Sequence, residues 1–318
     1  MSQFIPWNSQ PLEDWSKQYA KGTIIELEGK QTHYLKRDCA KQERPYLLLL
    51  HGLCYDSLMW TPNADELSKD YNIIALDLWG FGYSTREPLD YGYPLFAQQI
   101  HAFINYLGLE QVAIMGHSMG AGAAIEFSTH HPEKVSQLIL VDALGLPNSP
   151  HLFTRLMRTP ILGSALLKMN NNALRKKLMS CHLNRGEEII NDKLITEATW
   201  SQKIMGSNQV LLDIENRRFC DQLSDEIHHL GDQSFPVLII WGRQDKILPF
   251  TRGEHIHQVL GTNSQLEVID NAGHMVNLDQ TEIFNATVLD FLLKSEKEQK
   301  DLEREQQHLT PSGETEQT

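Results

Sequence analysis

Features that mark several protein classes are missing from this sequence, and each absence argues against one class of function. No apolar run in its 318 residues approaches the length of about 18 residues that a membrane span requires. Basic residues number 28 against 41 acidic ones, for a formal net charge of −13. This balance argues against a nucleic-acid partner, because phosphate binding needs a basic surface. Residues 1–7 have no basic start and no apolar stretch behind it, so no secretory signal is expected.

Cysteine is scarce and metal-ligand patterns are missing. The four cysteines, Cys39, Cys54, Cys181 and Cys220, are dispersed and lack the spacing of a metal site. Such usage favours free thiols in a reducing compartment, and we expect a cytoplasmic protein. The histidines show no ligand spacing either, so neither a metal nor another cofactor is predicted.

Short apolar runs that end in glycine, aspartate or turn residues recur along the chain. Their apolarity is continuous, which is typical of strands buried on both faces of a parallel sheet. Helical patterns over 95–107 and 118–130 separate some of them and predict βαβ units, hence an α/β fold. Segments 23–27 and 31–35 predict an antiparallel hairpin at the sheet edge. The expected buried strands cover 46–50, 73–76, 112–115, 138–141, 237–241 and 266–269.

The strand rhythm stops over 143–234, where helical stretches broken by prolines take over, and it resumes at Phe235. Because strands on both sides of this block are needed to complete one sheet, we expect an inserted helical cap over 143–234. The core would then comprise residues 1–142 and 235–293. The remaining segment, 294–318, is polar and is predicted to be a frayed helix followed by disorder.

The segment Gly116-His117-Ser118-Met119-Gly120 lies where an apolar run gives way to a small-residue helical stretch. A serine with glycine two residues away on either side, at a strand-to-helix turn, is the pattern of a nucleophile elbow. So sharp a turn forces the serine into a strained left-handed conformation, and the glycines leave space that Cβ atoms would fill. The pattern alone also fits a glycine-rich turn with a solvated serine.

A nucleophilic serine needs a base and an acid, and candidates for both follow later strands. Asp245 comes just after 237–241 and His274 just after 266–269, so both should stand at the sheet edge that carries Ser118. We predict that His274 takes the serine proton and that Asp245 orients the imidazole. Asp142, just after 138–141, is the alternative position for the acid.

Charge that develops on a carbonyl oxygen needs two hydrogen-bond donors. We predict that the backbone N–H of Met119, next to the nucleophile, is one. The other is the N–H of Leu53, in a loop where Gly52 permits close approach of the backbone. The residues expected to line the substrate pocket are Leu248, Met275 and Val276.

Other polar residues near these motifs have simpler predicted roles. His51 and His117 are expected to pack loops beside the site. Asp77 is expected to fix its glycine-rich loop rather than to transfer protons. Cys54 is expected to be a small buried thiol.

Taken together, these motifs resemble the α/β-hydrolase superfamily, over nearly all of the chain except its first residues and the polar tail. The resemblance is to capped esterase and lipase-like members, and it implies an eight-stranded, mostly parallel sheet and hydrolysis through an acyl-enzyme. Two departures are Leu53-Cys54, where some esterases carry a glycine run, and Trp79, where proline is usual. The matching motifs are His51-Gly52, the segment 77–84, the elbow around Ser118, Asp245 after Trp241-Gly242-Arg243, and Asn271-Ala272-Gly273-His274.

The resemblance also narrows the chemistry. Epoxide hydrolases and haloalkane dehalogenases of this fold use an aspartate at the elbow, so Ser118 argues against both. Carboxylic-ester hydrolysis of a small acyl substrate is the main prediction. Carbon–carbon bond hydrolysis, thioester hydrolysis, acyl transfer and cofactor-free haloperoxidase chemistry remain open. So does a non-catalytic, receptor-like protein that binds a ligand on this fold.

The first half of the predicted cap is basic, although the chain as a whole is acidic. Between Ala143 and Gly186 there is no aspartate or glutamate. One interpretation is that these cations steer anionic or lipid-like acyl substrates, or contact an anionic membrane surface. The other is that they form the cap's solvated face. The residues are Arg155, Arg158, Lys168, Arg175, Lys176, Lys177 and Arg185.

Overall fold

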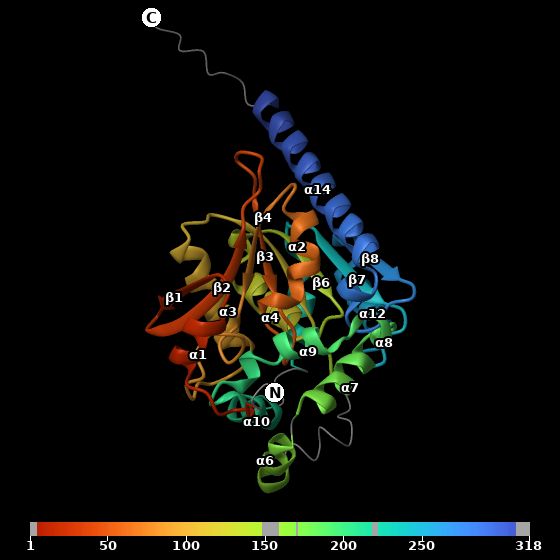
Figure 1. Cartoon of the computed structure of the whole chain (residues 1–318). Coiled ribbons are helices and arrows are strands. Elements are labelled where there is room, and N and C mark those ends of the chain that lie inside the picture. The colour runs from red at the N-terminus through yellow and green to blue at the C-terminus, as the bar shows by residue number, and fades with distance from the viewer. Residues whose placement is uncertain (1–4, 148–158, 170, 218–221, 310–318) are drawn as a thin grey trace, which may run out of the picture.

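The computed structural model describes residues 5–147, 159–169, 171–217 and 222–309. Within these ranges, eight strands form one sheet in the order β1-β2-β4-β3-β5-β6-β7-β8, with helices on both faces (Figure 1). The strands are β1 (Thr23–Leu27), β2 (Lys30–Arg37), β3 (Tyr46–Leu50), β4 (Asn72–Leu76), β5 (Val112–His117), β6 (Val135–Val141), β7 (Val237–Gly242) and β8 (Ser264–Ile269).

The sheet is parallel except at one edge. β1 pairs antiparallel with β2, and β2 pairs antiparallel with β4, whereas every pair from β4 to β8 is parallel. All the predicted strands and the predicted edge hairpin are therefore present. The predicted burial was wrong for β8, which lies at the other edge of the sheet and exposes Glu267. β5 and β7 are buried at every residue, as their continuous apolar sequences require.

Alternate residues of each strand divide the hydrophobic core into two layers. Leu48 and Leu50 of β3 join a cluster with α3 (Tyr93–Tyr106), α4 (Met119–His130) and α12 (Thr251–Leu260). Leu47 and Leu49 point to the other face and join a cluster with α2 (Thr61–Leu67) and α14 (Thr281–Leu309). This alternation follows from the two-residue period of a strand.

In the described part of the segment predicted as a cap, the secondary-structure elements are all helices, joined by loops. Most of its helices lie together at one end of the sheet (Figure 1). The exception is α11, which packs against α4 and α12 of the core through Ile227 and Leu230. The helices are α6 (Pro160–Lys168), α7 (Asn172–His182), α8 (Gly186–Ile189), α9 (Asp192–Ala198), η3 (Ser201–Lys203), α10 (Ser207–Arg217) and α11 (Ser224–Leu230).

The polar C-terminal segment begins as a helix, as predicted, and the helix is longer than expected. α14 continues to Leu309, so residues 294–309 are helical. The helix is anchored by apolar residues that it buries on the sheet, among them Phe284 and Phe291. Beyond these, Glu296 bonds to Arg44 and Tyr71 of the core. Residues 310–318 lie outside the described part of the chain.

The short elements complete the molecule. None of the described helices is both long and apolar enough to cross a membrane. The remaining elements are α1 (Leu12–Tyr19), η1 (Ser57–Trp60), η2 (Pro132–Lys134), η5 (Gly261–Asn263) and α13 (Val276–Asp279).

Candidate active site

Ser118 occupies a strained turn between β5 and α4. Its backbone has φ 53° and ψ −114°, a conformation that L-residues rarely adopt. The flanking glycines are sterically required. A Cβ at Gly116 would collide with the backbone of Gly120, and a Cβ at Gly120 would lie 2.5 Å from the carbonyl oxygen of Leu50. The elbow conformation predicted from the sequence is therefore present.

The side chains of Ser118, His274 and Asp245 form a continuous hydrogen-bonded line. His274 Nε2 lies 3.1 Å from Ser118 Oγ, and His274 Nδ1 lies 2.8 Å from Asp245 Oδ2. All three residues are buried. Each stands just beyond the carboxyl end of a parallel strand, and those ends meet at one edge of the sheet.

Asp245 is held in place by its own loop. Its Oδ1 accepts hydrogen bonds from the backbone N–H groups of Ile247, at 2.7 Å, and Leu248, at 2.9 Å. The carboxylate is thereby oriented with Oδ2 toward His274. An acid that is fixed in this way restricts the imidazole to one tautomer, with the proton on Nδ1 and a lone pair facing the serine.

Asp142 lies close by but does not occupy the position of the acid. Its Oδ1 accepts the N–H of Gly242 at 2.9 Å, and its Oδ2 has no partner among the described residues. Burial and the negative charge of Asp245 raise the pKa of Asp142 well above its usual range. The geometry therefore favours Asp245 over Asp142, as the sequence analysis did.

Two backbone N–H groups near Ser118 lack acceptors. A Cβ at Gly52 would lie 3.3 Å from Ser118 Cβ, so the loop after β3 runs beside the serine. In the part of the chain that the structure describes, neither the N–H of Leu53 nor that of Met119 donates to a protein oxygen. Unused donors at the head of a helix and in an adjacent loop suit an anion.

Comparisons with known proteins agree with this fold. A family model for the alpha/beta hydrolase fold matches residues 45–168. A meta-cleavage product hydrolase from Pseudomonas fluorescens superposes with a TM-score of 0.72 at 23% identity, covering 86% of this chain and 98% of that one. At this identity the likeness concerns the fold. The chain has the α/β-hydrolase fold.

Relatives of this α/β-hydrolase are diverse in their reactions. A putative carbamate hydrolase, RutD, from Pseudomonas savastanoi pv. phaseolicola is 26% identical over 274 residues, which are 80% of this chain and 96% of that protein. The pig (Sus scrofa) protein 1-acylglycerol-3-phosphate O-acyltransferase ABHD5 is 28% identical over 294 residues, which are 85% of this chain and 84% of that protein. The superfamily therefore establishes the fold and leaves the scissile bond open.

The histidines beside the site have the packing roles predicted for them. His51 accepts the N–H of Leu78 on Nε2 and donates from Nδ1 to Gly52 O, so it braces the loop that carries Leu53. His117 Nε2 donates to the carbonyl oxygen of His274 at 2.6 Å. Burial lowers the pKa of His51 and, more strongly, that of His117, so both rings are neutral supports.

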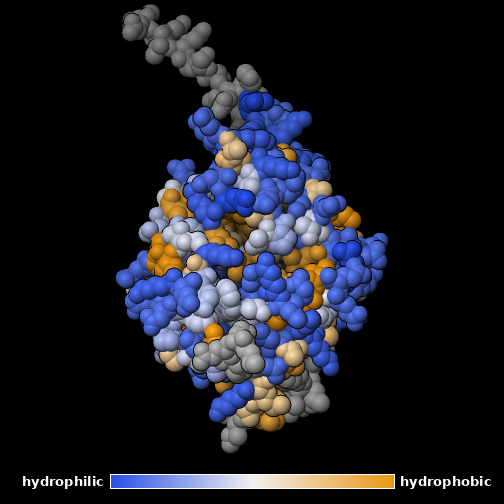
Figure 2. Space-filling model, viewed as in Figure 1, coloured by the Kyte–Doolittle hydropathy of each residue, from blue (hydrophilic) through white to orange (hydrophobic). Residues whose placement is uncertain are grey.

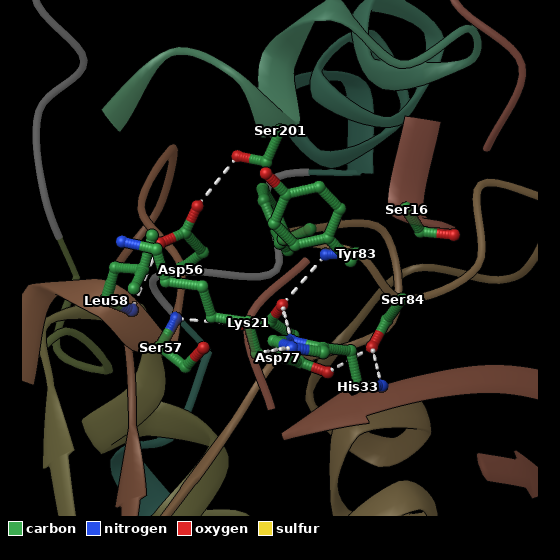
Figure 3. A network of polar contacts seen from close by, with 12 residues as sticks. Ser16, Lys21, His33, Asp56, Ser57, Leu58, Asp77, Tyr83, Ser84 and Ser201 are labelled. Carbon is green, nitrogen blue, oxygen red and sulfur yellow. Dashed lines mark hydrogen bonds and ion pairs between the residues drawn. The ribbon is translucent and has the colours of Figure 1, made fainter. Parts of the chain in front are cut away.

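Asp77 fixes the glycine-rich loop, also as predicted. Its carboxylate accepts the N–H of Ser57 at 2.7 Å, the N–H of Tyr83 at 2.8 Å and the His33 ring at 2.6 Å (Figure 3). Burial opposes ionisation, but the charge and hydrogen bond of His33 hold the pKa of Asp77 down at about 2. Asp77 is a structural anion that joins its own loop after β4 to the segment after β3 and to strand β2.

A second buried carboxylate connects this network to the cap. Asp56 Oδ2 accepts the hydroxyl of Ser201 in η3 at 2.8 Å, and Asp56 Oδ1 accepts the N–H of Leu58 (Figure 3). Burial and the negative charge of Asp77 raise the pKa of Asp56 to about 6. The sequence offered no signal for this role, because it depends on a cap residue 145 positions away.

Two cap contacts beside His274 were also missed by the sequence analysis. His182, at the end of α7, has its ring centroid 5.8 Å from that of His274, edge to face. His182 Nδ1 lies 3.1 Å from the hydroxyl of Tyr55, which follows the Leu53-Cys54 loop. Burial and the positive charges of His274 and Arg175 lower the pKa of His182 to about 3.

Asp279 attaches the cap to the histidine loop. Its carboxylate accepts the N–H of Gly273, the residue before His274, at 2.8 Å. The same carboxylate accepts the N–H groups of Asn184 at 2.8 Å and Arg185 at 2.9 Å, which follow α7. One buried side chain therefore sets the position of both His274 and the segment above it.

The residues predicted to line the substrate pocket are dispersed. Met275 lies in the wall of a cavity of about 490 Å³ between the sheet and the cap. Leu248 and Val276 are buried in hydrophobic clusters on opposite faces of the sheet. The described lining of the cavity includes Tyr55 but not Ser118. Figure 2 shows apolar side chains recessed between hydrophilic ones on the face that carries α2 and α9.

Among the described residues, one group of side chains has metal-ligand spacing. Ligand atoms of His117, Asp142 and His274 lie within 4.8 Å of one another. Both nitrogens of His274 already contact Ser118 and Asp245. A metal ion bound here would therefore compete with the Ser118–His274–Asp245 line.

Proposed function

We propose that this α/β-hydrolase is a serine hydrolase that cleaves carboxylic esters through an acyl-enzyme intermediate. The observation that carries the proposal is the unbroken line from Ser118 Oγ through His274 to Asp245, at 3.1 and 2.8 Å. Nucleophile and base are within hydrogen-bond reach, and the base is oriented by a third group. The two unused N–H groups beside the serine supply the remaining requirement.

The first half of the reaction follows from this arrangement. Ser118 Oγ attacks the ester carbonyl carbon while its proton moves to His274 Nε2. The carbonyl oxygen becomes negative and receives hydrogen bonds from the N–H groups of Leu53 and Met119, each worth roughly 3 kcal/mol in the transition state. The C–O bond to the alcohol then breaks, and the alcohol leaves with the proton from His274.

The second half returns the enzyme to its starting state. A water molecule loses a proton to His274 and attacks the acyl carbon. The bond to Ser118 breaks, the carboxylic acid leaves, and Ser118 recovers its proton from His274. Throughout both halves the Asp245 carboxylate stays ionised and stabilises the imidazolium ion that forms transiently.

Labelling with a fluorophosphonate probe and hydrolysis of p-nitrophenyl acetate test this proposal together. We expect wild type to show both, and Ser118→Ala to lose labelling and at least about 10⁴-fold of its kcat. Ser128→Ala is a matched control, because Ser128 is a buried serine of α4, the helix that follows Ser118, and its hydroxyl bonds to none of the described residues. Equal turnover by wild type and Ser118→Ala would refute the proposal.

The same assay distinguishes the alternatives. Faster cleavage of a thioester or a 1,3-diketone than of the matched ester would assign thioester or carbon–carbon bond hydrolysis. Saturable ligand binding without turnover of any of these compounds would favour a receptor-like protein. Contact of the exposed cap cations with anionic lipid stays a separate prediction, measured by co-sedimentation with vesicles that contain phosphatidylserine.

A further inference from the structure

Two of the described cations in the cap are buried, Lys203 of η3 and Arg175 of α7. The Lys203 ammonium lies over the Trp7 ring, 4.8 Å from the centroid. Arg175 of α7 is only 7% exposed, whereas Lys168, Lys177 and Arg185 are exposed to solvent. Its guanidinium lies over the Tyr55 ring, 4.8 Å from the centroid. One nitrogen, Nη2, donates to the carbonyl oxygen of Cys54 at 2.7 Å.

Arg175 has no counter-charge among the described residues. Its helix neighbour Lys176 pairs with Asp192, and Arg185 pairs with Glu188. No carboxylate of the described residues pairs with Arg175, and its Nε, although buried, has no hydrogen-bond partner. Burying a charge without a partner is costly, so its position requires an explanation.

Another buried arginine shows what a purely structural role looks like. Arg86 donates to the carbonyl oxygens of Phe81, Gly82 and Ser84 at 2.6–2.8 Å. Its donors are satisfied by these carbonyl oxygens and by the hydroxyl of Ser207. Arg175, by contrast, uses one of the five N–H donors of a guanidinium in its contacts with the described residues.

Holding the Cys54 loop does not account for Arg175 either. The carbonyl oxygen of Cys54 also accepts a hydrogen bond from Gln202 Nε2 at 2.9 Å. The loop therefore keeps a cap contact without the arginine. What distinguishes Arg175 is its unused hydrogen-bonding capacity.

Arg175 contacts the loop that lies beside the reacting groups. Cys54 directly follows Leu53, the predicted oxyanion donor, and Tyr55 contacts His182, whose ring packs on His274. The guanidinium is thus in contact with the loop that would receive the scissile carbonyl group.

We propose that Arg175 binds an anionic group of the substrate, a carboxylate or a phosphate, so that the natural substrate is a negatively charged ester. This inference rests on the proposed function and names the substrate class of the same site. A planar guanidinium with free donors matches either anion bidentately. The ion pair would also supply the counter-charge that Arg175 lacks.

A pair of esters with one leaving group tests this inference. The full-length protein is assayed with mono-p-nitrophenyl glutarate, which is anionic, and with p-nitrophenyl pentanoate, which is neutral. We expect Arg175→Gln to lower the ratio of kcat/KM for the anionic over the neutral ester about 10- to 100-fold. Arg175→Lys, which keeps the charge but not the fork, should retain part of the ratio. Lys177→Gln, an exposed cation of the same helix, should keep the wild-type ratio.

The outcomes separate the two proposals. An unchanged ratio in Arg175→Gln would overturn the inference. If both rates fall equally, the arginine only holds the loop in place. If wild type hydrolyses neither ester, the ester proposal fails, and calorimetric titration with glutarate and with inorganic phosphate tests the anion site directly. Binding that is weakened in Arg175→Gln supports the inference, and equal or absent binding in both proteins overturns it. Whichever of glutarate and inorganic phosphate binds more tightly identifies the anionic group of the substrate.

Discussion

Replacing Asp245 with asparagine tests how the acid acts. Asparagine has nearly the shape of aspartate, and its oxygen can still accept the N–H groups of Ile247 and Leu248. Its amide nitrogen would then face His274 Nδ1 in place of the carboxylate oxygen that is now 2.8 Å away. Two donors cannot bond to each other, so the imidazole would place its proton on Nε2 and could no longer accept the proton of Ser118.

The size of the effect follows from this tautomer change. The same substitution in serine proteases lowers kcat about 10⁴-fold, which corresponds to about 5 kcal/mol of transition-state stabilisation. We expect a loss of that order for Asp245→Asn, with little change in the free energy of unfolding. The assay is kcat and kcat/KM for p-nitrophenyl acetate from pH 5 to 9, with urea denaturation for stability.

Asp142→Asn is the matched comparison, because Asp142 is equally buried and adjacent to the site. Burial and the negative charge of Asp245 raise the pKa of Asp142 well above its usual range, which favours its neutral form. Asparagine has the shape of that neutral form and can still accept the N–H of Gly242. We expect a change of less than about threefold in kcat. A loss in Asp142→Asn as large as that in Asp245→Asn would refute this assignment of the acid.

Two further predictions concern stability. Gly120→Ala would place a Cβ 2.5 Å from Leu50 O, so its free energy of unfolding in urea should fall by about 1–3 kcal/mol. The free energy of unfolding of Gly231→Ala should fall by less, because Gly231 has an ordinary helical φ of −62°. Equal changes in the two variants would contradict the steric argument. In the folded protein the pKa of Asp56 is about 6, against an ordinary value of 3.8. Between these two pH values the unfolded chain therefore binds fewer protons than the folded protein. The contribution of Asp56 to the free energy of unfolding consequently declines as the pH rises from about 4 to 6. Asp56→Asn should therefore gain stability relative to wild type between pH 4 and 7 in denaturation curves, and a constant difference across that range would show that Asp56 does not titrate there.

Much of the fold and the three aligned residues could be predicted from local pattern. The buried strands are continuous apolar runs, and the edge hairpin follows a short polar turn. Because parallel strands end at one edge of the sheet, a residue just after such a run has a predictable location. Ser118, Asp245 and His274 each satisfy that condition, and the glycines at 116 and 120 mark the turn.

The cap could not be predicted in the same way. Arg175 and Lys177 are two residues apart on α7, yet one is buried and the other exposed. Which face of a cap helix turns inward depends on how it packs on distant loops, here through Cys54 and Tyr55. Likewise, the helix over 294–309 looked polar enough for disorder, but contacts of Glu296 with Arg44 and Tyr71 extend it along the core.

The amino-acid sequence by itself determined the sheet, the strained serine turn and the strand ends that carry the acid and the base. It could do so because these depend on strand burial and on the steric size of glycine, which are properties of short segments. Only the tertiary structure decided which aspartate meets His274, which donors stay unpaired beside Ser118, and which cap cation faces the site. Those outcomes depend on distances between residues far apart in the chain, such as Asp56 with Ser201 and Cys54 with Arg175.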